Sequence, residues 1–303
     1  MAITRFTLRQ LEIFATVVRT GQVKRAAQAL HLSQGAVSQA IRELADALDV
    51  ALFERQGRTI VPTAAARQLL QLTAAPMATL DDVAGQFGPA GPSQQLAGDI
   101  RLAASSTITR YILPAALAAL RRSHPALSIT VISGNSANVE ERVAALDADI
   151  GFIEGPSQRD DLDAAAWGTD TLQIIAPHDY ATDTVSIDAL DMHPWVARER
   201  GSGTRAVFEQ NLALAGYAAP RASLVIDDSG AIVRAVAAGA GLACVSRRAA
   251  TRASSTSPAV QFIELTGLSL ARPLWRVQRA APGRAPLLDR FLGVLDIALA
   301  DAR

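Results

Sequence analysis

The chain has 303 residues, half of them hydrophobic, and its acidic and basic residues are equal in number, so the formal net charge is zero. This length predicts two or three compact units, and the balanced charge excludes a polyanion-binding surface spread over the whole chain. A single cysteine, Cys244, excludes an intrachain disulfide framework and favours a reducing cytoplasm; neither a signal peptide nor a membrane span is expected.

The first predicted elements are three helices, over residues 8–18, 23–30 and 34–48, where apolar residues recur at three- and four-residue steps. A short polar break at residues 31–33 separates the second helix from the third. Ser33 is placed to cap the third helix by accepting backbone N–H bonds from its first turn. The outer face of that helix carries hydrogen-bonding side chains: Gln34, Ser38, Gln39, Arg42 and Glu43.

A short helix, a tight turn and a second helix with a polar outer face favour a helix-turn-helix over residues 22–41. Such a face suits the major groove of DNA, with Gln34, Ser38 and Gln39 toward base edges and Arg42 toward phosphates or neighbouring bases. The alternative is an ordinary helical hairpin with a solvated polar face, because this pattern is easily found by chance.

The flanking residues favour the DNA-binding interpretation. Residues 50–62 predict two short apolar strands joined by a turn at Gly57, which Arg55 and Arg58 bracket. Such a wing places both arginines where they can touch phosphates. Through Arg58 the chain carries eight basic and five acidic residues, a net charge of +3 in the part where DNA binding is predicted.

This part of the chain resembles the LysR-type transcriptional regulators. The resemblance rests on residues 8–11, Phe14, Gly21, 26–27, Leu30, 32–34, 36–38, Ile41, Leu44, Leu48, 52–55 and Thr63. Departures include Gly35, where the family often has proline, and Asp49, where it often has glycine. The family implies a winged helix-turn-helix domain over residues 6–63 that binds double-stranded operator DNA, with RNA polymerase as a possible further partner.

Residues 64–87 predict a helix whose apolar stripe comprises Leu69, Met77, Leu80, Ala84 and Phe87, and Pro76 is expected to kink it. An exposed stripe of this kind needs a partner, and a coiled-coil-like homodimer provides one. The alternative is a helix packed on its own domain. The resemblance implies a linker helix, a dimer and, through effector-domain contacts, a homotetramer. A Pro/Gly-rich hinge is predicted at residues 88–98.

Beyond the hinge, short apolar strands alternate with helices, which predicts parallel sheets covered by helices. Predicted strands cover residues 100–104, 128–132, 149–153, 172–176, 195–197, 223–226, 242–245, 260–265 and 275–278. Predicted helices cover residues 110–122, 139–146, 204–214, 231–238 and 287–300. Strings at residues 105–108, 111–114, 134–136, 149–156, 198–205, 246–248 and 274–276 are similar to the YeiE branch of the LysR family.

The resemblance implies that residues 99–303 form an α/β effector-binding domain of two subdomains, like the periplasmic binding-protein fold. Subdomain I would comprise residues 99–171 and 273–303, and subdomain II residues 172–272. The chain would cross between them near residues 169–172 and return near residues 272–274.

Ligands of open α/β sheets bind where strands end and helices begin, and helix N-termini favour anions. The predicted effector-binding residues lie at such junctions: Ser105, Ser106, Thr107, Asn135, Ser136, Gly155, Arg200, Gly201, Ser202 and Thr204. The hydroxyl and amide groups predict a small anion, with Arg200 as the balancing charge, and the resemblance suggests a sulfur oxyanion such as sulfite. The alternative is that these side chains only cap helices.

Two other functional classes are alternatives to a DNA-binding regulator. A solute-binding transport protein would share the second fold but not the DNA-binding part. Residues 201–206 fit the dinucleotide pattern G-x-G-x-x-A, yet the strand before them ends in Arg198-Glu199-Arg200, which is unlike a buried dinucleotide strand. No hydrolase, metal or Walker motif is present. We therefore predict a cytoplasmic DNA-binding regulator that responds to a small-molecule effector, with no catalytic, cofactor or metal site.

Overall fold

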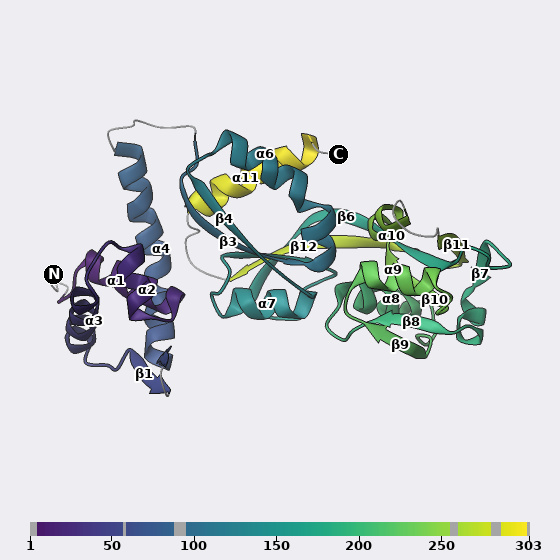
Figure 1. Ribbon diagram of the computed structural model, residues 1–303, viewed down its shortest axis with the longest axis horizontal. Coiled ribbons are helices and arrows are strands. Elements are labelled where there is room, and N and C mark those ends of the chain that lie inside the picture. Colours follow the sequence, from purple (N-terminus) through teal and green to yellow (C-terminus); the bar gives the residue numbers. More distant parts are fainter. Residues whose placement is uncertain (1–4, 57–58, 88–94, 255–259, 280–285, 302–303) are drawn as a thin grey trace. The chain divides into compact units, whose positions relative to one another are not determined.

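The computed structural model describes residues 5–56, 59–87, 95–254, 260–279 and 286–301 (Figure 1). It divides into two compact units. The first comprises residues 1–96 and 281–291, and the second comprises residues 97–280 and 292–303. The predicted hinge at residues 88–98 lies largely outside the described residues.

The first unit is built on α1 (Leu8–Thr20), α2 (Val23–Ala29) and α3 (Gln34–Leu48). Thr7 and Gln10 form a capping box at the start of α1, and the predicted cap of α3 is confirmed, since Ser33 Oγ accepts a bond from the Ala36 N–H at 3.1 Å. The three helices bury two apolar clusters: Val17 and Val37 belong to one, and Phe14 and Leu44 belong to the other.

One departure from the family pattern has a visible backbone consequence. Asp49 ends α3 with φ +54°, in the left-handed region where glycine is usual and where aspartate is among the better tolerated alternatives. Gly35 lies in the first turn of α3, and a Cβ built there meets only Ser33 Oγ, at 3.8 Å. Close packing therefore does not require glycine at position 35.

The predicted wing is present as two antiparallel strands, β1 (Phe53–Gln56) and β2 (Thr59–Pro62), which pair Phe53 with Pro62. Gly57 and Arg58, at its predicted turn, lie outside the described residues.

Helix α4 (Ala64–Phe87) follows the wing and remains helical through Pro76. The predicted exposed stripe is partly wrong: Leu69 and Met77 pack, half-buried, on the core formed by α1 and α3. The reason is that the first turns of α4 run beside α1 and must bury a face there. The exposed apolar side chains described on α4 are Leu72 and Leu80, exposed to 68% and 41%. Ala84 and Phe87 lie outside the described side chains.

The second unit contains a chain of hydrogen-bonded strands in the order β4-β3-β5-β12-β6-β10-β8-β9, to which β11 and β7 add through β6. The bounds are β3 Gly98–Ser105, β4 Leu127–Gly134, β5 Ile150–Glu154, β6 Leu162–Pro177, β7 Thr184–Ser186, β8 Trp195–Arg198, β9 Ala222–Ile226, β10 Leu242–Ser246, β11 Val260–Thr266 and β12 Ala271–Arg279.

Strand β6 joins two sheets, and the predicted crossing near residues 169–172 falls where it changes partners. Its first part, residues 162–171, pairs with β12, and residues 172–177 pair with β10 and β11. The prediction of parallel sheets is confirmed for some strand pairs and wrong for β6 and β12. Strand β3 is parallel to β4 and β5, but β6 and β12 run antiparallel to their neighbours. This follows from the return of the chain through β12, which brings a strand back in the opposite direction.

Helices cover both faces of each sheet (Figure 1). The helices are α5 Ser106–Tyr111, α6 Leu113–Ser123, α7 Ser136–Ala144, α8 Gly203–Leu214, α9 Ser229–Ala237, α10 Arg247–Ser254 and α11 Pro286–Asp301, with a 3₁₀ turn at Ile187–Met192. In subdomain II, Phe208 of α8 packs on one face of the sheet and Ile232 of α9 on the other.

The prediction of one helix over residues 110–122 is also wrong. The structure has α5 and α6, which meet at Ile112, and Pro114 sits in the first turn of α6. Proline has no backbone N–H donor and is favoured in the first turn of a helix, where that donor is not needed, so Pro114 favours a new helix start here.

Candidate functional site

The outer face of α3 brings together four of the six predicted DNA-binding side chains. Gln34, Gln39 and Arg42 are exposed, and Ser38 is half-buried. The opposite face of the same helix buries Val37, Ala40 and Leu44. The hydrogen-bonding face is therefore free of the domain's own core and available to a groove of DNA.

The side chains on this face form a hydrogen-bonded row. Arg42 Nη2 donates to Gln39 Oε1 at 2.9 Å, and Gln39 Nε2 donates to Glu43 Oε1 at 2.9 Å. Gln10 of α1 donates to the other oxygen of Glu43, also at 2.9 Å. Glu43 thus orients the amide of Gln39. The sequence does not reveal that α1 holds Glu43 in turn, because Gln10 lies 33 residues away from it.

Arg55 is exposed on β1, where it pairs with Ile60 across the wing, while Arg58 lies outside the described residues. Two further cations, Lys24 and Arg25, are exposed on α2. Sequence reasoning counted them in the basic excess of this part but assigned them no role. They lie in the first turn of α2 and add exposed positive charge to the DNA-binding unit.

In the second unit, several predicted effector-binding residues cap helices, as the alternative interpretation holds. Ser105 Oγ accepts the Ile108 N–H at 3.3 Å at the start of α5. Asn135 forms a capping box with Asn138 at the start of α7. Ser202 occupies the N-cap of α8 without such a side-chain bond.

A buried ion network lies behind these caps. The guanidinium of Arg272, with 0% of its surface exposed, donates to Asp170 Oδ2 at 2.6 and 3.0 Å and to Thr204 Oγ1 at 2.8 Å. Arg272 Nη2 also lies 3.5 Å from Glu154 Oε1, which accepts the Ser105 hydroxyl at 2.8 Å. Buried charges persist only when paired and hydrogen-bonded, so the network fixes the region where β6 and β12 cross.

The start of α8 in subdomain II packs directly on subdomain I, in a contact that we call the subdomain junction. The Ala137 N–H donates to the Gly201 carbonyl at 3.2 Å, and the Glu154 N–H donates to Ser136 Oγ at 3.2 Å. A Cβ added at Gly203 would lie 2.4 Å from the Glu154 carbonyl oxygen. Predicted residues from three strand ends thus lie together, but they fill the space between them.

Other predicted residues sit around this junction. Thr107 is 1% exposed, and among the described residues its hydroxyl has no hydrogen-bond partner. Gly155 has φ +77°, and a Cβ there would lie 2.8 Å from Val207 of α8. Ser106 is half-buried and Ser202 is buried. An unpaired buried hydroxyl is costly, and Thr107 is therefore the side chain here with most to gain from a bound ligand.

The arginines near the junction differ in their surroundings. Arg200, the predicted balancing charge, is exposed. Arg198 is 4% exposed, donates to both oxygens of Glu199 at 2.8 and 3.0 Å and donates to Ser229 Oγ at 2.8 Å. The buried positive charges on this side of the domain are therefore Arg198 and Arg272, each already held by a carboxylate.

An ion pair spans the two subdomains. Arg110 Nη1 of α5 lies 2.6 Å from Asp228 Oδ2, while Asp228 Oδ1 caps α9 in subdomain II by accepting the Ala231 N–H at 2.7 Å. Burial acts to raise the pKa of Asp228, but the Ala231 N–H and the charge of Arg110 outweigh it, and the pKa is lowered. The Arg110 side chain is 52% exposed, so the pair contributes about 0–1 kcal/mol to holding the subdomains together.

Cys244 is buried, and burial raises the pKa of its thiol to about 12, so it stays protonated and unreactive near neutral pH. Among the described residues, no group of metal-ligating side chains is gathered. In the same part of the chain, no helix is long and apolar enough to cross a membrane.

The comparison with known proteins agrees with both units. Residues 8–67 match the family model of the bacterial regulatory helix-turn-helix protein, lysR family, and residues 93–299 match the LysR substrate binding domain. The HTH-type transcriptional regulator YeiE of Escherichia coli (strain K12) is 35% identical over 294 residues, covering 96% of this chain and 98% of the relative. The regulator CysL of Bacillus subtilis (strain 168) is 31% identical, covering 87% and 88%.

Solved structures share the fold. A full-length OxyR variant from Pseudomonas aeruginosa superimposes with a TM-score of 0.78 at 19% identity, covering 97% of this chain and 94% of that chain. The regulatory domain of CcmR from Synechocystis PCC6803, in complex with 2-PG, has a TM-score of 0.60 at 23% identity and covers 67% and 97%.

Proposed function

The chain belongs to the LysR family of bacterial helix-turn-helix transcriptional regulators, and we propose that a small anion, bound at the subdomain junction, controls its operator binding. It has the family's DNA-binding domain and effector-binding domain. The observation that carries the DNA-binding role is the exposed face of α3, with Gln34, Ser38, Gln39 and Arg42 beside the wing arginine Arg55. The rivals, a solute-binding protein or a nucleotide-dependent enzyme, lack such an observation.

The first prediction separates phosphate contacts from base contacts. Arg55→Ala should weaken binding to every duplex, because the wing arginine neutralises a phosphate. The slope of the logarithm of the binding constant against the logarithm of the salt concentration should fall in magnitude by about one. Ser38→Ala should instead change preference at one operator position, by about 1–3 kcal/mol where a good base contact is lost. Filter binding over a salt series, together with competition by operator variants, measures both. Wild-type slopes and preferences in both variants would refute the assignment.

For the effector, we propose a small anion or a molecule with an anionic group. The support is the convergence of helix N-termini and donors at the junction, above all the unpaired hydroxyl of Thr107. Sulfite is one candidate, suggested by the likeness to the YeiE branch. Of the relatives, one solved regulatory domain holds 2-PG. Because the junction is packed, ligand entry requires the start of α8 to move away from β5, which makes binding and subdomain closure one equilibrium.

The second prediction concerns Thr107. Thr107→Ala should reduce anion affinity only several-fold, since backbone donors remain, whereas Thr107→Asp should abolish it by placing a carboxylate where the anion's charge would sit. Calorimetry with sulfite, sulfate and small carboxylates tests both variants. Binding of an uncharged or cationic compound that Thr107→Asp abolishes, with no anion bound by the wild type, would overturn the anion and keep the site.

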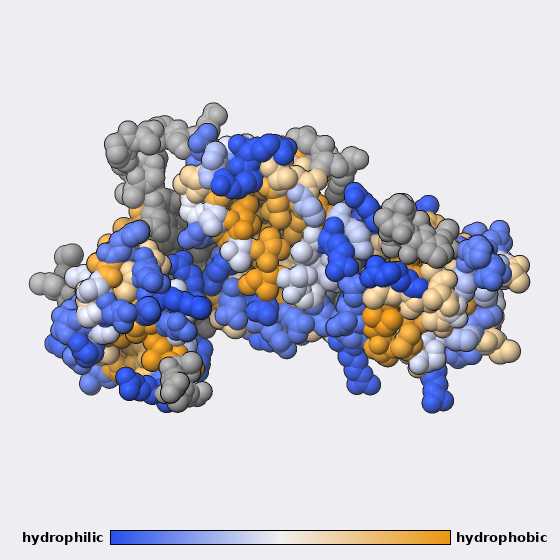
Figure 2. Space-filling view, in the orientation of Figure 1, coloured by the Kyte–Doolittle hydropathy of each residue, from blue (hydrophilic) through white to orange (hydrophobic). Residues whose placement is uncertain are grey.

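For assembly, we propose a homodimer through α4 and pairing of dimers into a homotetramer through the effector domains. Exposed Leu72 and Leu80 on α4 support the first step. Figure 2 shows apolar surface over α8 and β9, where Leu214, Leu224 and Val225 are exposed to 80%, 42% and 52%, and this supports the second.

The third prediction tests the dimer. Leu80→Glu places a charge at the proposed seam, where it would be desolvated without a partner, and should shift the protein toward smaller species. Gln68→Glu, on an exposed position of the same helix outside the apolar seam, is the matched control and should leave assembly unchanged. Sedimentation at micromolar concentration is the measurement, and a monomeric wild type would contradict the proposal.

We also propose that the protein works in the cytoplasm, where its DNA target lies, and acts by population shift. Effector binding changes subdomain closure, closure changes the spacing of paired DNA-binding domains, and spacing changes how the operator is bent. RNA polymerase is a further partner under this proposal. No catalytic step, cofactor or metal enters the mechanism.

A further inference from the structure

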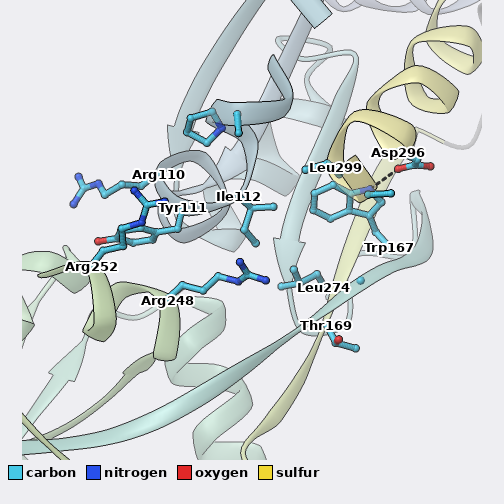
Figure 3. A pocket seen from close by; sticks show the side chains of 14 residues that line it. Arg110, Tyr111, Ile112, Trp167, Thr169, Arg248, Arg252, Leu274, Asp296 and Leu299 are labelled. Carbon is cyan, nitrogen blue, oxygen red and sulfur yellow. Dashed lines mark hydrogen bonds between the residues drawn. The ribbon is translucent and has the colours of Figure 1, made fainter. Parts of the chain in front are cut away.

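A cavity of about 360 Å³ lies away from the subdomain junction, between α5, α6, α10, α11 and the strands β6 and β12 (Figure 3). This volume is at the lower end of the range of about 300–1,000 Å³ that is usual for small-molecule sites. None of the ten residues predicted to bind the effector lines it.

Three guanidinium groups, of Arg110, Arg248 and Arg252, line one side of the cavity, with the ring of Tyr111 among them (Figure 3). Arg110 uses Nη1 on Asp228, and Arg248 lies with its Nε 3.5 Å from an oxygen of Asp170. Each guanidinium has five N–H donors in a fork that matches a carboxylate, so donors remain on both groups after these contacts. The side chains of Arg110 and Arg248 are 52% and 46% exposed, which leaves them accessible to a ligand.

The other side of the cavity is apolar. Trp167, Leu274 and Leu299 line it (Figure 3). The indole is fixed from behind, because its ring centroid lies 4.3 Å from that of Phe152 and its Nε1–H donates to Asp296 Oδ1 at 2.9 Å. Asp296 is the one carboxylate among the lining residues; Oδ1 accepts this bond, and Oδ2 lies 4.0 Å from Arg276 Nη1, which offsets its charge. A rigid aromatic wall thus faces a cluster of cations.

We propose that this cavity is a second ligand site, which binds a small carboxylate carrying an aromatic or branched aliphatic body. The carboxylate pairs with Arg248 and Arg252, and the body packs on Trp167 and Leu274. An inorganic anion would leave the apolar wall unused, and an uncharged ring would leave the guanidinium groups unused.

The site has a structural consequence. Helix α10, which supplies Arg248 and Arg252, belongs to subdomain II, whereas α5, α6 and α11 belong to subdomain I. A ligand held by both sides links the subdomains and favours the arrangement in which they stand close. The proposal stands on the cavity alone and does not depend on the anion proposed for the subdomain junction.

The test is calorimetry on the full-length protein with phenylacetate as the probe. Acetate keeps the charge without the apolar body, and phenylacetamide keeps the body without the charge. We expect saturable binding of phenylacetate at one site per chain, and no measurable binding of the other two at the same concentrations.

Variants locate the binding. Arg252→Gln should weaken phenylacetate binding at least about tenfold by removing a charged donor. Ala115→Trp should abolish it by filling the cavity from α6. Arg122→Gln, an exposed arginine of α6 outside the lining, and Arg200→Gln, an exposed arginine at the subdomain junction, should leave it unchanged. Thermal denaturation of each variant verifies that it folds, and the two lining variants act independently of each other.

Absence of phenylacetate binding, or equal binding of phenylacetamide, overturns the proposal. So does binding that Arg200→Gln abolishes while Ala115→Trp leaves it intact, because the ligand would then occupy the junction. That last result would favour the effector proposal above, so failure of one proposal is distinguishable from failure of the other.

Discussion

Replacing Arg272 with methionine should lower the free energy of unfolding of the effector domain by about 3–5 kcal/mol, because it removes one partner of a buried ion network. Arg272 is fully buried and holds Asp170 through bonds of 2.6 and 3.0 Å. Methionine keeps most of the volume but leaves Asp170 and Glu154 without their shared cation. The cost is then mainly that of burying carboxylates that have lost their strongest partner, since the ion pair of Asp170 with the partly exposed Arg248, at 3.5 Å, remains.

Arg276→Met is the matched control on the same strand. Arg276 lies 4.0 Å from Asp296, and both side chains are partly exposed, so its loss should cost about 0–1 kcal/mol. Urea denaturation followed by near-UV circular dichroism measures both variants. A loss below about 1 kcal/mol in Arg272→Met would mean that the network contributes no more than a surface ion pair.

The second large effect is expected at Gly203. Gly203→Ala places a Cβ 2.4 Å from the Glu154 carbonyl oxygen and 2.5 Å from Ser136 Oγ, and a strand backbone cannot yield as a flexible side chain would. The start of α8 must therefore move away from β5. We expect a loss of about 1–3 kcal/mol, as for other overpacked sites, and faster hydrogen exchange at Ala137, whose N–H bonds to Gly201.

Gly293→Ala supplies the comparison, because no atom lies within 4 Å of a Cβ at this position in α11. It should be neutral or should stabilise by up to about 1 kcal/mol through helix propensity. Unchanged exchange at Ala137 in Gly203→Ala would show that α8 and β5 do not close on each other in solution.

The DNA-binding helices were predictable from sequence because their signals are local. The apolar repeat of α3 and its Ser33 cap lie within a few residues of one another, and both are confirmed. The first part of β6 was missed because residues 162–171 combine three consecutive alanines with polar residues and show no apolar alternation. Helix α10 was missed because its sequence is dominated by arginine and small residues, without an apolar stripe to indicate a helix.

The subdomain junction was less predictable because its contacts join residues that are far apart in the sequence. Strand ends correctly indicated which residues would lie together, but not that Gly203 and Glu154 fill the space between them. The bonds of Arg272 join it to residues 68 and 102 positions away, so no spacing in the sequence announces them. Two signals were available in the sequence. Arg272 is a charged residue next to a proline in an apolar strand, and Glu154 is a charged residue at the end of a buried strand.

The charged side chains that line the cavity of Figure 3 could not be grouped from the sequence either. Arg110, Arg248 and Arg252 come from helices more than a hundred residues apart, and only the fold brings them to one wall. Arg110 lies in the last turn of α5, which ends at Tyr111. Helix α6 begins two residues later, at Leu113, with Pro114 in its first turn.

The central claim is that this protein reads a DNA sequence through α3 and its wing. The most direct measurement is competition, at one fixed salt concentration, between duplexes selected by the protein from a random pool and unselected duplex of the same length. The account predicts that selected duplex binds at least about a thousandfold more tightly. It also predicts two related half-sites spaced by about one helical turn or a multiple of it. Equal affinity for selected and unselected duplex would contradict the account.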